Sequence, residues 1–187
     1  MRGVHKPGTF VPIKMGLVAV FAVASACSSA FGQDHLTWRC DVPNGRFVQN
    51  PQSISPTSNA LSGQIQFDGS RFGEQWNPTA HVAFTDSKLP TNGDCFCNGI
   101  RASIYPSEPE TVKFFMIYNG QSEGIAQAPV GKPITFRMSI DEGGVLTVAI
   151  GKTNPAVKTA QLFHVDRDTM QLSCSSGNVN FLNVQAE

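Results

Sequence analysis

The stretch Pro133–Ile150, PITFRMSIDEGGVLTVAI, contains two runs of alternating apolar and polar residues separated by a glycine-containing turn. In the first run every second residue is apolar: Ile134, Phe136, Met138 and Ile140. Because successive side chains of a strand point to opposite faces, this pattern predicts a strand with one face in a core. The turn Asp141–Gly144 predicts a hairpin, since glycine readily takes the positive φ of a tight turn. The second run, Val145–Ile150, predicts the returning strand, with either Val145 or Leu146 pointing inwards.

The same two-residue period recurs along the chain after residue 33, and no segment there has a helical period. Further strands are predicted at residues 62–68, 79–85, 100–105, 111–118, 170–174 and 178–184. The polar stretch Asn50–Asn59 predicts a long surface loop, and Ser175–Gly177 predicts a hairpin turn. Roughly nine strands at this spacing are typical of an all-β sandwich or barrel.

The N-terminal segment has the parts of a secretory signal peptide. The first 14 residues contain three basic side chains and no acidic one. The apolar run Met15–Ala26 follows and is too short to span a membrane. Ala30–Gly32 then fits the small-x-small rule for cleavage. We therefore expect a signal peptide at residues 1–32, one mature domain at residues 33–187, and a secreted, periplasmic or extracellular location.

A lipid anchor is an alternative at Cys27, because Ala24–Cys27 resembles a bacterial lipobox. The segment has alanine where leucine is usual, so we favour simple cleavage. No other apolar run is long enough to cross a membrane.

The charge of the chain depends on whether the signal peptide is present. The whole sequence has 14 Lys and Arg against 14 Asp and Glu. Removal of residues 1–32 takes away three of the basic residues and none of the acidic ones, which leaves a net charge of −3. A weakly acidic domain with scattered charges lacks the basic patch expected of a protein that binds nucleic acid or anionic lipid.

Four cysteines remain in the mature chain: Cys40, Cys95, Cys97 and Cys174. Disulfides are the expected state in an exported protein. A direct bond between Cys95 and Cys97 would close a very small ring. We therefore expect each of these two to bond a different partner, one Cys40 and the other Cys174, in an order that the sequence does not give. A zinc site would need a second pair of ligands at short spacing, and a redox pair is usually C-x-x-C.

Two segments, PITFRMSIDEGGVLTVAIG and MQLSCSSGNVNFLNVQ, resemble the closing strands of the concanavalin A-like (laminin G-like) lectin and glucanase superfamily, with no specific member indicated. The resemblance implies an antiparallel two-sheet sandwich of the jelly-roll type. That superfamily contains lectins, glycosidases, lyases and adhesion modules, so the fold by itself does not give the function.

The catalytic motifs of that superfamily are absent from this sequence. No E-x-D-x-x-E run of the glucanases occurs, and no calcium- and manganese-binding loop of the legume lectins. Gln64-Ile65 is followed by Gln66, where the Q-I-H motif of the lyases has histidine. The segment Phe115–Tyr118 does not match the lyase motif Y-x-K-x-G. These differences favour a non-catalytic protein with no catalytic residue, cofactor or bound metal to assign.

Two acidic pairs have the i, i+2 spacing that can place carboxyl groups at the separation of a retaining glycosidase. Glu108 and Glu110 flank a proline in what reads as a solvated turn. Asp166 and Asp168 flank an arginine and also read as a polar turn, with a calcium site as the alternative.

One further group of polar residues is predicted to share a sheet face. His81, Arg101, Tyr105 and Tyr118 lie opposite inward-pointing apolar residues or at strand ends. The group is interpreted as an ordinary polar sheet face, with a lyase-like site as the alternative.

Two segments combine aromatic rings with polar side chains, as a sugar-binding surface requires. The first is the loop 71–77, with candidate ligand-binding residues Phe72, Glu74, Trp76 and Asn77. The second is the segment 118–123, with candidates Tyr118, Asn119 and Gln121. The sequence therefore favours a secreted, non-catalytic module that binds a glycan or another extracellular polymer. The alternatives are a polysaccharide-active enzyme with a divergent site and an envelope or matrix protein that binds other proteins.

Overall fold

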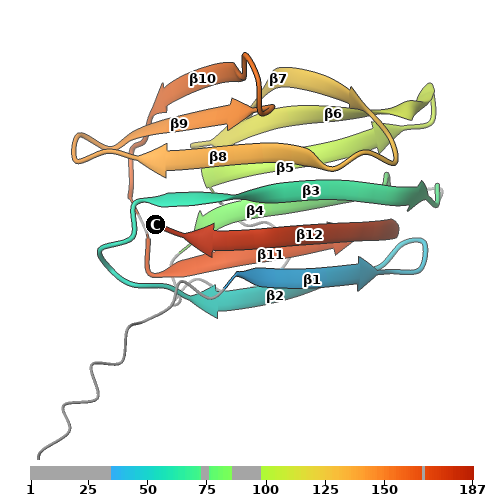
Figure 1. Ribbon diagram of the computed structural model, residues 1–187, viewed down its shortest axis with the longest axis horizontal. Helices are drawn as coiled ribbons and strands as arrows, with labels where there is room; N and C mark the ends of the chain where they lie inside the picture. Colours follow the sequence, from blue (N-terminus) through green and yellow to red (C-terminus); the bar gives the residue numbers. More distant parts are fainter. Residues whose placement is uncertain (1–34, 73–75, 86–97, 166) are drawn as a thin grey trace, which may run out of the picture. The chain divides into compact units, whose positions relative to one another are not determined.

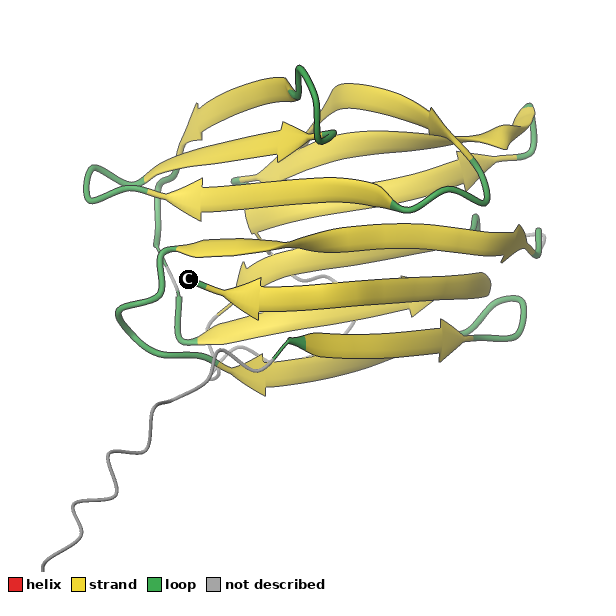
Figure 2. Cartoon of the chain, in the orientation of Figure 1, coloured by secondary structure: helices red, strands yellow, loops and turns green. Residues whose placement is uncertain are grey.

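The computed structural model describes residues 35–72, 76–85, 98–165 and 167–187, and within these ranges every regular element is a β-strand (Figure 2). The strands are β1 (Leu36–Asp41), β2 (Phe47–Ser53), β3 (Ala60–Ser70), β4 (Thr79–Thr85), β5 (Asn98–Tyr105), β6 (Glu108–Tyr118), β7 (Gln121–Pro129), β8 (Ile134–Ile140), β9 (Val145–Ile150), β10 (Ala156–Gln161), β11 (Thr169–Ser175) and β12 (Gly177–Ala186).

The strands form two six-stranded sheets that lie one behind the other (Figure 1). The first sheet has the order β1-β12-β3-β8-β9-β10, and the second has the order β2-β11-β4-β5-β6-β7. Every pair of neighbouring strands is antiparallel. The prediction of an all-β antiparallel sandwich is confirmed.

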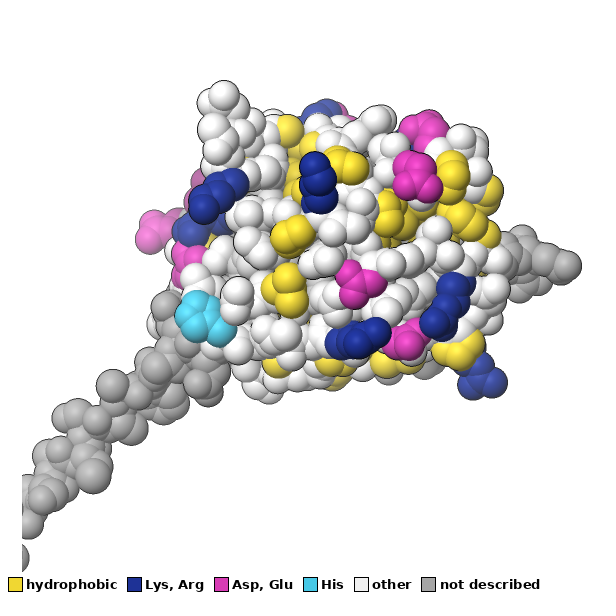
Figure 3. Space-filling view, turned by 45° about the vertical axis from the view of Figure 1, so that its right-hand side comes forward, with side chains coloured by type: hydrophobic (Ala, Val, Ile, Leu, Met, Phe, Trp, Pro, Cys, Tyr) yellow, Lys and Arg dark blue, Asp and Glu magenta, His cyan; other side chains and the backbone are white. Residues whose placement is uncertain are grey.

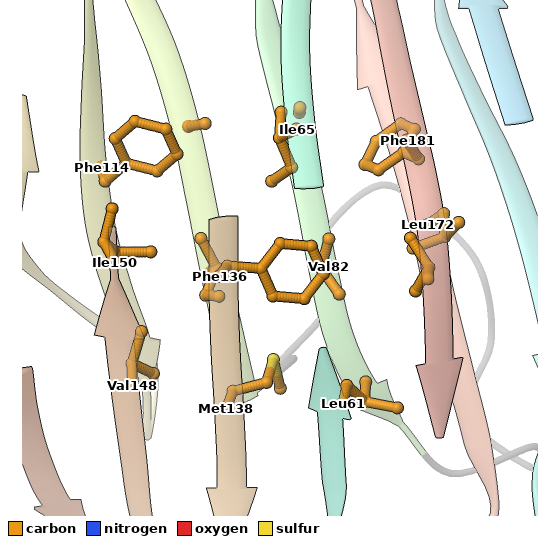
Figure 4. Close-up of a cluster of buried hydrophobic side chains, with 14 of the residues drawn as sticks. Leu61, Ile65, Val82, Phe114, Phe136, Met138, Val148, Ile150, Leu172 and Phe181 are labelled. Atoms are coloured by element: carbon orange, nitrogen blue, oxygen red, sulfur yellow. The ribbon is translucent and has the colours of Figure 1, made fainter. Parts of the chain in front are cut away.

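The hairpin that predicted the fold is β8 and β9, in which Phe136 pairs with Ile150 and Met138 pairs with Val148. Leu146, rather than Val145, points into the core. Apolar side chains from both sheets meet between the layers and are at most 4% exposed (Figure 4). Those drawn there include Ile65, Phe136 and Phe181 from the first sheet and Val82, Phe114 and Leu172 from the second. The two-residue period therefore builds the core, because each strand contributes one apolar face.

Four strands were not predicted: β1, β2, β7 and β10. They are the edge strands of the two sheets. An edge strand covers less of the core than an interior strand, and its polar residues discourage pairing with another chain. The prediction of a loop at residues 50–59 was wrong for residues 50–53, which belong to β2. Glu108 and Glu110 likewise lie at the start of β6 and not in a turn.

The segment Ser175–Gly177 is not a hairpin turn, because β11 lies in the second sheet and β12 in the first. Ser176 joins them with a positive φ of 51° and is fully buried. Its hydroxyl accepts a hydrogen bond from the backbone N–H of Gly45 at 3.0 Å. The chain therefore crosses between the layers here, and a local turn pattern does not distinguish a crossover from a hairpin.

The predicted disulfide pairing was also wrong, because Cys40 and Cys174 bond to each other. Their Cα atoms are 6.4 Å apart although the residues are separated by 134 positions. Both side chains point into the core, from β1 in one sheet and β11 in the other, so the bond links the two layers. Cys95 and Cys97 lie outside the described residues.

Residues Gly32–Glu187 form one compact unit. Charged side chains of both signs are scattered over the face of the molecule shown in Figure 3. Within the described ranges, no helix has the length and hydrophobicity that a membrane span requires.

Candidate functional site

A line of residues crosses the second sheet on the face turned away from the core. The pairing register aligns six residues on neighbouring strands: Gln49, Ser173, His81, Arg101, Phe115 and Gly124. We call this line the polar row. Its members alternate along each strand with core residues such as Val82 and Leu172, so they point to the opposite side of the sheet.

His81 lies in the middle of the polar row and is mostly buried. Burial, with a smaller contribution from the positive charge of Arg101, lowers the pKa of His81 from its ordinary value of 6.5 to about 4. The imidazole is therefore neutral at pH 7. Its Nε2 atom is buried and has no hydrogen-bond partner among the described residues.

We expect His81 to make stability depend on pH. In the unfolded chain His81 binds a proton as the pH falls below 6.5, whereas in the folded chain it does not do so until about pH 4. The stabilisation from neutral His81 is thus complete above pH 6.5 and is lost between pH 6.5 and pH 4, which amounts to about 3 kcal/mol. Urea unfolding of the wild type and of His81→Gln at pH 7 and pH 4 measures this loss, because glutamine does not titrate. An equal loss of stability in both proteins would contradict the prediction.

Arg101 carries the positive charge of the polar row. One Nη atom donates a hydrogen bond to the Ser122 hydroxyl at 2.9 Å, and the guanidinium lies 4.7 Å from the ring centroid of Phe115. Its Nε atom is buried and has no hydrogen-bond partner in the described part of the chain. Among the described residues, no carboxylate forms an ion pair with Arg101. The charge is therefore held by a ring and a neutral hydroxyl.

Two further polar groups of β11 are buried beside His81 and have no hydrogen-bond partner within the described ranges. Ser173 is 1% exposed and its hydroxyl is unpaired, while Gln171 is 6% exposed and its side-chain nitrogen is unpaired. Ser173 is the register partner of His81, and Gln171 is two positions further along the same face. Neither residue was predicted as part of a site, although the alternation of Gln171 and Ser173 with Met170, Leu172 and Cys174 indicates the outer face for both.

The line of residues next to the polar row is built from small side chains. Ala83 on β4 is paired with Gly99 on β5. A Cβ atom on Gly99 would lie 2.2 Å from the carbonyl oxygen of Val82, so only glycine fits at this position. Ala83 is only 3% exposed and Gly99 is buried, so this part of the face is covered.

Aromatic rings continue the polar row on the side of β6. Tyr105 packs edge-on against Phe115, with 6.4 Å between the ring centroids. The ammonium of Lys113 lies 5.7 Å from the ring of Tyr105 and forms an ion pair with Glu108 at 2.6 Å.

Of the four residues predicted to share this face, His81, Arg101 and Tyr105 do so. Tyr118 does not, because it packs against the core cluster on the other side of the sheet. Tyr118 is an even-numbered residue of β6, like the buried Phe114 and Met116.

The loop 71–77 places Trp76 at one end of the sandwich with 49% of its surface exposed. Arg71 forms an ion pair with Asp41 at 2.8 Å, and the Asn44 amide donates to the backbone carbonyl of Phe72 at 3.1 Å. The ring of Phe72 packs against the core cluster. Trp76 is therefore the exposed aromatic of this loop, and Phe72 anchors it. Glu74 lies outside the described residues.

Asn77 contributes to this loop through its backbone. Its carbonyl oxygen accepts hydrogen bonds from the hydroxyls of Thr79 and Ser175, both at 3.1 Å. These bonds hold the end of the loop against β4 and β11, directly after Trp76 in the chain.

The second predicted segment forms the hairpin between β6 and β7, with Asn119 and Gly120 at positive φ. The Asn119 amide donates to the carbonyl of Gln161 at 2.8 Å and accepts from the N–H of Phe163 at 3.0 Å. Asn119 therefore holds neighbouring loops together, while Gln121 is exposed.

The two candidate segments lie at opposite ends of the sandwich. Residue Thr79, directly after the Trp76 loop, pairs with Ser103 at one end of β5. Ile117, next to Tyr118, pairs with Gly99 at the other end of β5. The structure therefore does not bring the two segments into one site.

Within the described ranges, no group of three or more His, Cys, Asp and Glu residues is placed to hold a metal ion. Asp166 lies outside these ranges, so a calcium site at Asp166 and Asp168 stays a prediction.

No protein-family model matches the chain, and no curated protein matches it. Among solved structures, a xylan β-1,4-xylosidase from Bacillus halodurans C-125 aligns with 80% of this chain at 6% identity and a TM-score of 0.51. A sialidase aligns with 81% of this chain at 11% identity and a TM-score of 0.52. The aligned part is 32% of the xylosidase chain and 15% of the sialidase chain.

The fold is an all-β sandwich of two antiparallel sheets. The carbohydrate binding module CBM66 from Bacillus subtilis is also similar, with 18% identity, a TM-score of 0.47, and coverage of 82% of this chain and 92% of that one. At these levels of identity the likeness of this sandwich to other structures shows the fold alone.

Proposed function

We propose that the mature chain is a secreted, non-catalytic module that binds carbohydrate, with residues 1–32 removed as a signal peptide. The observation that supports this proposal most directly is the half-exposed ring of Trp76, which is 49% accessible at the end of the sandwich. A sugar has an apolar ring face and a rim of hydroxyls, so it stacks on an indole and hydrogen-bonds to polar groups around it.

Polar side chains of the right kind lie near Trp76 in the loops at this end. Asn44 lies beside the carbonyl of Phe72, and the Asp41–Arg71 ion pair is half exposed on both sides. Trp76 also lies next to Gly45 of the β1–β2 loop, since a Cβ on that glycine would be 4.0 Å from the indole ring. The ring is thus supported by backbone while one part of it stays accessible.

We expect Trp76→Ala to weaken glycan binding by about 1–3 kcal/mol, which is the range for an aromatic anchor. The melting temperature should change little, because half of the side chain already lies in solvent. A glycan array on the mature protein identifies a ligand, and calorimetric titration of the wild type and the variant with that ligand measures the loss.

Phe163→Ala is the matched control, because Phe163 is an aromatic residue with 88% exposure in the β10–β11 loop, at the end that holds Asn119. This variant should bind the glycan as the wild type does. Loss of folding in Trp76→Ala, together with no ligand on the array, would overturn the proposal and leave Trp76 a structural residue.

A further inference from the structure

The crossover Ser175–Gly177 is hydrogen-bonded to both loops that lie at Trp76. One is the β1–β2 loop at residues 42–46, and the other is the loop 71–77, which contains Trp76 itself. Ser175 is 3% exposed and Ser176 is fully buried, so the crossover is an interior part of the molecule. The two loops are exposed at many positions, which makes the crossover the buried support of an exposed region.

The loop 71–77 is attached to the crossover at its two ends. Where the loop begins, the backbone N–H of Arg71 donates to the carbonyl of Ser176 at 3.3 Å. Where it ends, the Ser175 hydroxyl donates to the carbonyl of Asn77 at 3.1 Å. Asn77 follows Trp76 directly in the chain, so two neighbouring residues of the crossover hold the loop on either side of the indole.

The β1–β2 loop is attached to the same crossover. The N–H of Val42 donates to the carbonyl of Gly177 at 2.9 Å, and the N–H of Gly45 donates to the Ser176 hydroxyl at 3.0 Å. Gly45 is the residue next to the indole, since a Cβ atom on it would lie 4.0 Å from the ring of Trp76. The Ser176 hydroxyl therefore holds the backbone against which the ring lies.

The backbone of Ser176 gives a second reason to connect its hydroxyl with this support. Ser176 has a positive φ of 51°, a conformation that glycine adopts readily and that costs free energy for a residue with a Cβ atom. Glycine would avoid that cost but would not supply a hydroxyl. The hydrogen bond to Gly45 is thus what serine contributes here and glycine could not.

We infer that Ser176 is the positioning residue of the Trp76 site. Its carbonyl holds the loop that contains Trp76, and its hydroxyl holds the loop beside the ring. A ring that is held in place before a sugar arrives loses less conformational freedom on binding, which favours affinity. The inference rests on the proposed function in one respect, because it takes Trp76 as the contact with the glycan.

The test removes the hydroxyl of Ser176 in two ways. Ser176→Gly also relieves the cost of the positive φ, whereas Ser176→Ala keeps the Cβ atom and that cost. The two variants should therefore differ in stability to urea but affect Trp76 alike. Ser58→Gly is the matched control, because Ser58 is also buried, at 7% exposure. It precedes the first residue of β3, whereas Gly177 pairs with Ser70, the last residue of that strand.

Two NMR measurements on the mature protein need no ligand. Hydrogen exchange of the Gly45 amide should become at least about tenfold faster in both Ser176 variants, because the bond that protects it is lost. The indole N–H signal of Trp76, assigned by its loss in Trp76→Ala, should shift in both variants. The signal of Trp38, which is stacked on Phe181, should not shift. An unchanged Trp76 signal, or an equal shift of both indole signals, would overturn the inference.

Binding is then titrated with three neutral hexasaccharides, namely cellohexaose, xylohexaose and mannohexaose. Both Ser176 variants should bind about three- to tenfold more weakly than the wild type, the change expected for loss of one supporting hydrogen bond. Ser58→Gly should stay within about twofold of the wild type. Wild-type affinity in the Ser176 variants would show that the placement of the ring does not matter for binding, and it would contradict the positioning role.

The measurements without ligand separate this inference from the proposed function. If neither the hexasaccharides nor a glycan array gives a ligand, the proposed function fails, while the Gly45 exchange rate and the Trp76 signal still decide whether Ser176 places the ring. If a glycan binds and Trp76→Ala abolishes binding but the Ser176 variants bind like the wild type, the proposed function stands and the positioning role of Ser176 is wrong.

Discussion

Replacing both Cys40 and Cys174 by alanine is expected to lower the free energy of unfolding by about 4 kcal/mol. The bond joins residues 134 positions apart, so its loss frees a very long loop in the unfolded chain. In the chain-entropy treatment a loop of more than 100 residues corresponds to about 5 kcal/mol, and measured values for native disulfides are typically about 2–5 kcal/mol. The effect is large because this bond also links the two sheets through the core.

Urea unfolding of the mature wild type and the double alanine variant measures this loss. The double variant is then unfolded in the presence of a reductant. Any further fall in its free energy of unfolding is the contribution of a disulfide that involves Cys95 or Cys97. The reductant should destabilise the wild type by at least as much as the double substitution does. An unchanged urea midpoint in the double variant would show that the Cys40–Cys174 bond is not formed in solution.

Replacing Phe136 by alanine is expected to cost about 3–5 kcal/mol of stability, the range for deletion of a fully buried aromatic side chain. Phe136 has no exposed surface and lies among buried residues of both sheets (Figure 4). Its register partner on β3 is Gly63, which has no side chain to fill the space that the ring would leave. The cavity should therefore persist, and the protein should lose both the transfer free energy and the packing contacts of the ring.

Thermal and urea unfolding of Phe136→Ala check this expectation, with Phe163→Ala as the control. Phe163 is 88% exposed, so the same chemical change there should alter stability by no more than about 0.5 kcal/mol. Phe136→Leu, which keeps most of the apolar volume, should cost clearly less than Phe136→Ala. Similar stabilities for Phe136→Ala and the wild type would contradict the packing described for this core.

The local sequence pattern was sufficient for the eight interior strands and failed at the four edge strands. Interior strands such as β8 and β9 bury every second side chain over most of their length, so their composition alternates. The edge strands β7 and β10 have no fully buried side chain, and their alternation is correspondingly weak. A pattern that arises from burial is weakest where a strand has a neighbour on only one side.

The residues of the candidate sites were also predicted correctly in part and wrongly in part. The two-residue period placed His81, Arg101 and Tyr105 on one face, because the direction of a side chain along a strand is a local property. The exposure of Trp76 agrees with the polar composition of its loop, whereas Asp41 and Asn44 near it come from β1 and the loop after it. The position of Tyr118 on the core side was misjudged, since it lies at the end of a strand where apolar residues are nearly continuous.

The sequence by itself determined the fold class, the interior strands, and for most residues of those strands which ones face the core. The tertiary structure alone decided which strands are neighbours, and hence that Ser173 lies beside His81 and that Cys40 bonds Cys174. These contacts join β4 to β11 and β1 to β11, segments far apart in the chain. Their formation depends on which of the twelve strands belongs to which sheet and in what order the strands pair. A local pattern of alternation shows which side of a strand is apolar, but it does not show which strand lies next to it.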